Sequence, residues 1–169
     1  YTGGFERGTV EIASALKNAG WTPVVVSGGG RMVVDLNRMG VEHITLPVYS
    51  KNYFVMRKNA DTLAKLIKEK NVDIIHARSR APAWSAKWAA QKANIPFLTT
   101  FHGAYNMGPF KIKRGYNKVM AEGDLVIAVS EFIKRHIMEN YGTPEERIRL
   151  IHRGVDIDRF DAKKVTPDR

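Results

Sequence analysis

The sequence has 169 residues, 44% of them hydrophobic, which is enough for one sizeable core and too short for a second full domain. It has no run of about 18 apolar residues, and it opens on Tyr1-Thr2-Gly3-Gly4, so we expect neither a membrane span nor a signal peptide. Cysteine is absent, which excludes disulfides and thiolate metal sites and favours a cytoplasmic location. The excess of 27 Lys and Arg over 17 Asp and Glu gives a net charge of +10, which fits either a solvated basic face or an anionic partner.

Short β-branched runs alternate with longer stretches of helical spacing along the chain. This alternation is typical of βαβ units, and it predicts an α/β fold of the Rossmann-like, doubly wound kind, with a mainly parallel sheet and helices on both faces. Several runs are almost wholly apolar, as strands covered on both faces require. The expected strands are Pro23 to Ser27, Glu42 to Leu46, Val72 to Ala77, Phe97 to Phe101, Leu125 to Val129 and Ile148 to Ile151.

Helical spacing predicts the helices that separate these strands. The first carries an apolar stripe and ends at Gly20, which is expected as a left-handed cap. Ser130 is placed to cap the last helix. Two helices are marked by apolar stripes, one at Ile12, Ala13, Leu16 and Ala19 and one at Leu63, Leu66 and Ile67. The other expected helices span Arg31 to Met39, Trp84 to Ala93, Lys113 to Glu122 and Glu131 to Asn140.

The predicted order begins with a glycine loop and a helix, whereas a doubly wound domain normally begins with a strand near the middle of its sheet. The first strand is therefore expected to be missing, either because the sequence is a piece of a longer chain or because its start is not ordered. A sheet without that strand has unpaired edges beside the gap. We predict such edges and, as a hypothesis, pairing or strand exchange with a second copy.

Candidate ligand-binding residues follow the predicted strands. Gly3 and Gly4 precede the first helix, where glycine lets backbone N–H groups approach a phosphate, although a tight turn explains the same pair. Arg78 and Arg80 follow the strand that ends at His76-Ala77, and their forked donors suit phosphate or carboxylate unless they cap carbonyls or pair with acids.

A histidine, His102, follows the next strand in Thr99-Thr100-Phe101-His102-Gly103. Imidazole in such a position can donate to a hydroxyl or a developing charge, whereas a lone histidine is more often structural. Open α/β sheets bind ligands at the carboxyl ends of their strands. The central prediction is therefore that Gly4, Arg78 and His102 converge on one edge of the sheet.

Five sequence blocks, taken together, resemble the N-terminal domain of family 4 glycosyltransferases. They occur in the family's order and span nearly the whole sequence. Arg78-Ser79-Arg80-Ala81-Pro82-Ala83-Trp84 is similar to bacterial members linked to lipopolysaccharide or other surface polysaccharides. The blocks are Gly3-Gly4-Phe5-Glu6-Arg7-Gly8, His76-Ala77-Arg78-Ser79-Arg80, Thr99-Thr100-Phe101-His102-Gly103, Ile127-Ala128-Val129-Ser130 and Arg153-Gly154-Val155-Asp156-Ile157-Asp158-Arg159-Phe160.

The resemblance implies one half of a GT-B enzyme, in which two Rossmann-like domains face each other across a cleft and transfer a sugar with retention. Residues 1–160 would be the acceptor-binding N-terminal domain, and residues 161–169 the start of a linker or tail. The donor would be a nucleotide sugar and the acceptor a saccharide or a lipid-linked one, with no metal and no other cofactor.

The same resemblance implies roles for individual residues. Gly3 and Gly4 would face the donor diphosphate, and His102 would be the catalytic histidine near the transferred sugar. The acceptor would contact the segments that contain Arg78, Arg80, Tyr105 and Asn106.

Two departures from the family's pattern bear on these roles. His152-Arg153 stands where the family usually has proline and asparagine, so the asparagine's role is not transferred. The family's second domain would begin shortly after Phe160, and by the resemblance it holds the basic residues for the donor phosphates. The 169-residue chain alone is therefore expected to be inactive.

Other classes of protein remain as alternatives. A non-catalytic basic domain could bind an anionic ligand or the inner face of a membrane. Nucleic-acid binding is disfavoured, because neither a recognition-helix module nor a sheet of stacking aromatics is evident. A dinucleotide-dependent oxidoreductase would need Gly-x-Gly-x-x-Gly between a strand and a helix, and Gly28-Gly29-Gly30 lacks that spacing.

Overall fold

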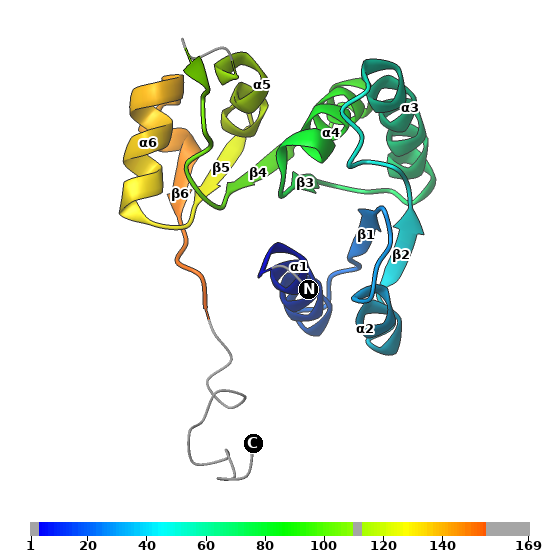
Figure 1. Ribbon diagram of the computed structural model, residues 1–169. Helices are drawn as coiled ribbons and strands as arrows, with labels where there is room; N and C mark the ends of the chain where they lie inside the picture. Colours follow the sequence, from blue (N-terminus) through cyan, green and yellow to red (C-terminus); the bar gives the residue numbers. More distant parts are fainter. Residues whose placement is uncertain (1–3, 110–112, 155–169) are drawn as a thin grey trace, which may run out of the picture.

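A computed structural model describes residues 4–109 and 113–154, in which helices and strands alternate as predicted (Figure 1). Each predicted strand is present, some of them shorter at one end. The strands are β1 (Val24–Ser27), β2 (Glu42–Thr45), β3 (Ile75–Ala77), β4 (Phe97–Phe101), β5 (Leu125–Ala128) and β6 (Ile148–Leu150). The helices are α1 (Gly4–Asn18), α2 (Val33–Arg38), α3 (Tyr53–Glu69), α4 (Arg80–Ala93), α5 (Arg114–Lys118) and α6 (Glu131–Tyr141), with 3-10 turns η2 (Val119–Ala121) and η3 (Glu145–Arg147).

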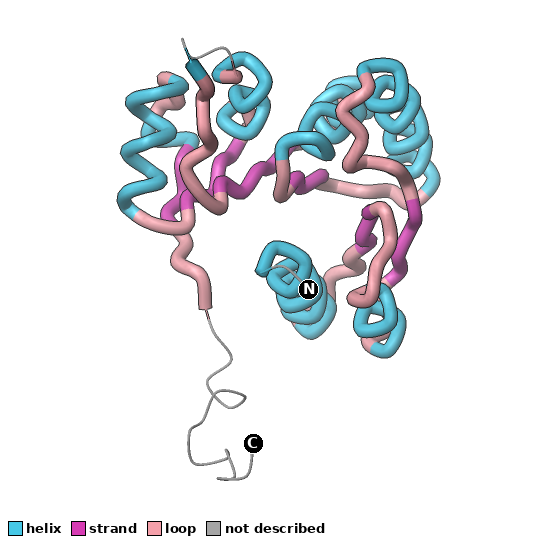
Figure 2. Tube along the Cα trace, in the orientation of Figure 1, coloured by secondary structure: helices cyan, strands magenta, loops and turns pink. Residues whose placement is uncertain are grey.

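All strand pairs in the described residues are parallel, which confirms the predicted sheet type. β1 and β2 form one sheet, and β3, β4, β5 and β6 form a second sheet in that order. Among the described residues, β1 pairs only with β2 at one edge, and β3 pairs only with β4. The predicted unpaired edges are therefore confirmed, and the two sheets are separate in Figure 2. Self-association through these edges stays a prediction.

Helices cover both faces of β1. Successive side chains of a strand point to opposite sides, so neighbouring residues of β1 pack against different helices. Val25 packs with Ala13 of α1 and with the α2 region. Val26 packs on the other face with Leu63 and Ile67 of α3. The near-continuous apolar sequence of β1 is therefore explained by helices on both faces of the strand, as predicted.

The larger core lies between the four-stranded sheet and helices α4 and α6. Alanines on α4 let it approach α3 closely, and Ser85 Oγ donates to the carbonyl of Met56 at 3.0 Å. At the other end of the sheet, Phe101 is fully buried against Tyr105 and Tyr141. The core thus fixes the strand ends from which the candidate residues follow.

Helix ends follow the predicted capping chemistry. Ser130 Oγ accepts from the backbone N–H of Ile133 at 3.2 Å, which confirms it as the cap of α6. Gly20, just past α1, has a φ of +86°, as a left-handed residue after a helix does.

The apolar stripe of α1 is not fully buried, because Ile12 and Leu16 are each 39% exposed. Ile12 lines a pocket instead of the core.

Candidate functional site

The residues that directly follow the strands of the larger sheet line one pocket. Arg78 follows β3, His102 follows β4, and residues after β5 and β6 complete the wall. Helix α1 closes the other side. We call this cavity, of about 330 Å³, the rim pocket. Its lining residues are Gly8, Glu11, Ile12, Arg78, Thr100, His102, Ile127, Val129, Ile151, His152, Arg153 and Gly154.

The structure therefore brings Arg78 and His102 together, as predicted. Parallel strands cause this, because their carboxyl ends meet at the same edge of a sheet. Gly4 begins α1, and Gly8, one turn further along the helix, lines the pocket. The place of Gly4 at this site stays a prediction. Gly3 lies outside the described residues.

His76 of β3 supports the pocket from within the sheet. Its Nε2 lies 2.7 Å from Oγ1 of Thr100 on the neighbouring strand β4. Burial lowers the pKa of His76 to about 4, and the nearby charge of Arg78 adds to the effect. The imidazole is therefore neutral at pH 7, and it holds the hydroxyl of a residue that lines the rim pocket.

His102 is likewise neutral at pH 7. Burial lowers its pKa to about 4, with further contributions from the charges of Arg78 and Arg153 and from His76. A neutral imidazole has one ring nitrogen that donates a hydrogen bond and one that accepts. His102 can thus bind a hydroxyl of a ligand in the rim pocket without carrying a charge there.

Arg80, only two residues from Arg78, belongs to a different part of the structure. Its Nη1 donates to Oδ1 of Asn117 at 2.9 Å, and its Cζ lies 4.6 Å from the ring centroid of Tyr105. Asn117 is fully buried, and its Nδ2 donates to the carbonyl of Asn106 at 3.2 Å. Arg80, Tyr105 and Asn106 therefore form a second cluster around Asn117. The four residues predicted to touch the acceptor fall into two groups, of which only Arg78 lines the rim pocket.

Sequence reasoning assigned no site role to several lining residues, among them Gly8, Thr100 and Arg153. A Cβ atom on Gly8 would lie 2.9 Å from Nη2 of Arg78 and 3.6 Å from Nη2 of Arg153. Gly8 is thus required for the close approach of two arginine side chains to α1. The place of Arg153, shortly after the last strand, was the signal that could have found it.

Two further properties of the described part of the chain bear on ligands. Within residues 4–109 and 113–154, no group of three or more His, Asp or Glu side chains is arranged to hold a metal ion. None of the helices described there has the length and apolar character needed to cross a membrane.

The fold is that of one half of a GT-B glycosyltransferase, a class in which two such domains face each other. The family model for Glycosyltransferase Family 4 matches residues 2–159, so this chain belongs to that family. Among curated proteins, none matches the sequence.

Several solved structures share this fold. A glycosyltransferase from Rickettsia africae ESF-5 is 49% identical, with a TM-score of 0.83 over 98% of this chain and 44% of its own. Anabaena Alr3699/HepE in complex with UDP and glucose is 18% identical, with a TM-score of 0.68 over 92% of this chain and 42% of its own. The lipopolysaccharide outer core galactosyltransferase WaaB is 17% identical, with a TM-score of 0.69 over 92% of this chain and 43% of its own. This chain thus spans less than half the length of these proteins.

Proposed function

We propose that this chain is the acceptor-binding half of a retaining glycosyltransferase, which moves a sugar from a nucleotide-diphosphate donor to a polysaccharide or lipid-linked acceptor. The observation that carries the proposal is the rim pocket, in which Arg78 and the neutral His102 lie together at the carboxyl edge of the sheet. Alr3699/HepE, of similar fold, was crystallised with UDP-glucose, and WaaB is a galactosyltransferase, which supports a nucleotide-sugar donor.

The rim pocket suits sugar transfer because the reaction separates charge. The leaving diphosphate gains negative charge as its bond to the sugar breaks, and fixed cations stabilise it. Arg78 places one cation in the rim pocket of this half of the enzyme. His102 binds a hydroxyl of the transferred sugar and orients it, while remaining neutral itself. No cofactor other than the nucleotide-sugar substrate takes part.

A fusion protein tests this role for His102. The 169-residue chain alone is expected to show no turnover of a sugar nucleotide, since it spans 44% of the Rickettsia africae enzyme. Joined to the remaining part of that enzyme, it is expected to release nucleoside diphosphate in the presence of EDTA. His102→Ala in the fusion should lower kcat by about 100-fold, because a positioned group at the reacting sugar is lost. Nucleoside diphosphate release is measured in a coupled assay.

The matched control is His43→Ala, because His43 lies on β2 and its Nε2 is 2.8 Å from Ser27 Oγ, outside the rim pocket. It should leave kcat within about twofold of the unsubstituted fusion. An active fusion whose rate is the same with and without His102 would contradict the proposed role. Turnover by the isolated chain would contradict its predicted inactivity.

A second candidate function, attachment at the inner face of a membrane, is favoured by one patch of the surface. We define the aromatic patch as Tyr49, Tyr53 and Phe54, which are 69%, 56% and 79% exposed at the start of α3. The aromatic contacts continue onto α4, where Tyr53 packs edge-on against Trp88 and Trp88 packs against Trp84. Exposed aromatic rings are typical anchors at membrane interfaces.

Basic residues lie next to the aromatic patch in the sequence and suit anionic lipid. Lys51, Arg57 and Lys58 are all exposed. The combination of exposed rings and cations is that of proteins that lie on anionic membranes without crossing them. A lipid-linked acceptor would then be bound at the surface where it resides.

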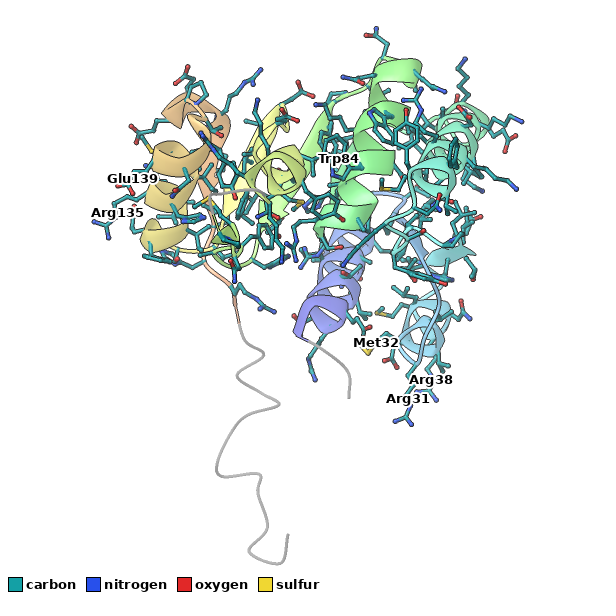
Figure 3. All side chains as sticks on the ribbon, turned by 45° about the horizontal axis from the view of Figure 1, so that its top comes forward. Arg31, Met32, Arg38, Trp84, Arg135 and Glu139 are labelled. Carbon is teal, nitrogen blue, oxygen red and sulfur yellow. The ribbon has the colours of Figure 1, made fainter. Side chains whose placement is uncertain are left out.

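Flotation with vesicles that contain phosphatidylglycerol tests this candidate. The protein is expected to float at low salt and to float less at moderate salt, because screening weakens the attraction. Replacing both Arg57 and Lys58 by Gln should weaken binding by about tenfold or more. Replacing Arg31 and Arg38 by Gln is the charge-matched control, since these side chains project from the far end of the α2 region (Figure 3). Equal binding to neutral vesicles would remove this candidate.

A further inference from the structure

Two arginine side chains meet over one glycine of α1 in the rim pocket. The position of a Cβ atom on Gly8 lies 2.9 Å from Nη2 of Arg78 and 3.6 Å from Nη2 of Arg153. Burial lowers the pKa of Arg78, and the charge of Arg153 lowers it further. The two like charges therefore repel each other, and the repulsion is stronger where water is excluded. An anion between the two guanidinium groups would turn this repulsion into attraction.

The rim pocket has both room and a donor for such an anion. The guanidinium groups of Arg78 and Arg153 lie beside Gly8, where a side chain would otherwise be, and both residues line a pocket of about 330 Å³. The Nε of Arg78 is buried and has no hydrogen-bond partner among the described residues. A buried donor without a partner is costly, and a ligand oxygen would satisfy it.

The charges that line the rim pocket also favour an anion. Glu11 is the only acidic side chain among its described lining residues. Its Oε1 already accepts from Nε of Arg7 at 2.9 Å. Glu11 offsets only part of the positive charge, because its carboxylate is shared with a second arginine.

Phosphate fits this arrangement better than a carboxylate does. Planar guanidinium groups bind either anion through forked donors. A phosphate group carries more charge and more acceptor oxygens than a carboxylate, so it can accept hydrogen bonds from two guanidinium groups at once. Arg78 follows β3 and Arg153 follows β6, so their guanidinium groups approach the pocket from different strand ends.

We propose that Arg78 and Arg153 together bind one phosphate group of the substrate in the rim pocket, where their guanidinium groups meet beside Gly8 of α1. The phosphate site itself is inferred from the geometry of the rim pocket. Only the identity of the molecule that carries the phosphate rests on the proposed function. That molecule is either the nucleotide-diphosphate donor or an acceptor that bears a phosphate. In both cases the bound group lies in the same pocket as His102.

Nuclear magnetic resonance of the 169-residue protein tests the site. The ring resonances of His102 are followed while inorganic phosphate, pyrophosphate, glucose 1-phosphate or glucose 6-phosphate is added at constant ionic strength. A saturable shift is expected, together with a rise in the pKa of His102, because a nearby anion favours the charged imidazole. Strongest binding of pyrophosphate assigns the site to the donor. Strongest binding of glucose 6-phosphate assigns it to the acceptor, and either result supports the proposal.

Substitutions separate the site from general charge. Arg78→Gln and Arg153→Gln should each weaken phosphate binding by about tenfold or more, since each removes a charged fork. Arg38→Gln, with a side chain 77% exposed on α2, should leave it unchanged. Gly8→Ala keeps both charges, yet its Cβ would displace the guanidinium of Arg78, so binding should weaken here too. Thermal unfolding of each variant confirms that it is folded.

Three results would overturn the proposal. The first is a shift that grows with every salt alike and never saturates. The second is unchanged phosphate binding in both Arg78→Gln and Arg153→Gln. The third is tighter binding of gluconate than of every phosphate compound. The proposed function is tested separately, by His102→Ala in the active fusion. An unchanged rate there would contradict the proposed role of His102 and leave the phosphate site standing.

Discussion

The free energy of unfolding should fall by about 3 kcal/mol or more as the pH is lowered from 6.5 to about 4. His76 has a pKa of about 4 in the folded protein, against 6.5 in the unfolded chain. Between these values the unfolded chain binds a proton that the folded protein does not, so stability is complete above pH 6.5 and is lost on acidification. His102 shifts in the same direction and adds to the loss.

Urea unfolding at a series of pH values measures this loss. His76→Gln and His102→Asn should flatten the slope between pH 6.5 and 4, because neither replacement titrates there. The carboxylates act in a lower range. Burial raises the pKa of Glu122, but the hydrogen bonds and charges of Lys87 and Lys118 bring it below 4.5, so its contribution is lost only below that value. A stability that is flat from pH 6.5 to 5 would contradict the neutral state of both histidines.

Phe101→Ala should lower the free energy of unfolding by about 3–5 kcal/mol. Phe101 is fully buried at the end of β4, and its ring centroid lies 4.8 Å from that of Tyr105 and 5.6 Å from that of Tyr141. Its removal leaves a cavity beside these rings, in addition to the lost burial of the side chain. Because His102 is the next residue, its pKa should also move toward 6.5 as water enters.

Phe132→Ala is the matched control, since Phe132 lies on α6 and is 62% exposed. It should cost less than about 1 kcal/mol, because a mostly exposed ring loses little burial. Equal losses for the two variants in urea unfolding would show that the end of β4 is not the packed element that the structure describes.

Local pattern was sufficient to predict the elements of the fold. The β-branched and apolar runs at Phe97 to Phe101 and Leu125 to Val129 predicted strands, and β4 and β5 lie there. Ser130 marked the start of α6 through a hydrogen bond to a backbone group three residues away. These properties depend on neighbours along the chain, so they can be inferred without the tertiary structure.

The sequence also placed Arg78 and His102 at one edge, because the carboxyl ends of parallel strands always meet there. It could not separate Arg78 from Arg80. Both follow β3, but the packing of α4 against Asn117 takes Arg80 into a different cluster. That choice depends on the side chains surrounding each guanidinium group, which come from distant segments.

The sequence by itself thus determined the parallel α/β class and the edge at which the ligand residues gather, since periodicity and strand direction are local properties. Only the tertiary structure decided that Gly8, Arg78 and Arg153 meet at one point. These residues come from α1 and from the chain segments after β3 and β6, far apart in sequence. Their distances depend on how helices pack against the sheet, and no local pattern encodes that packing.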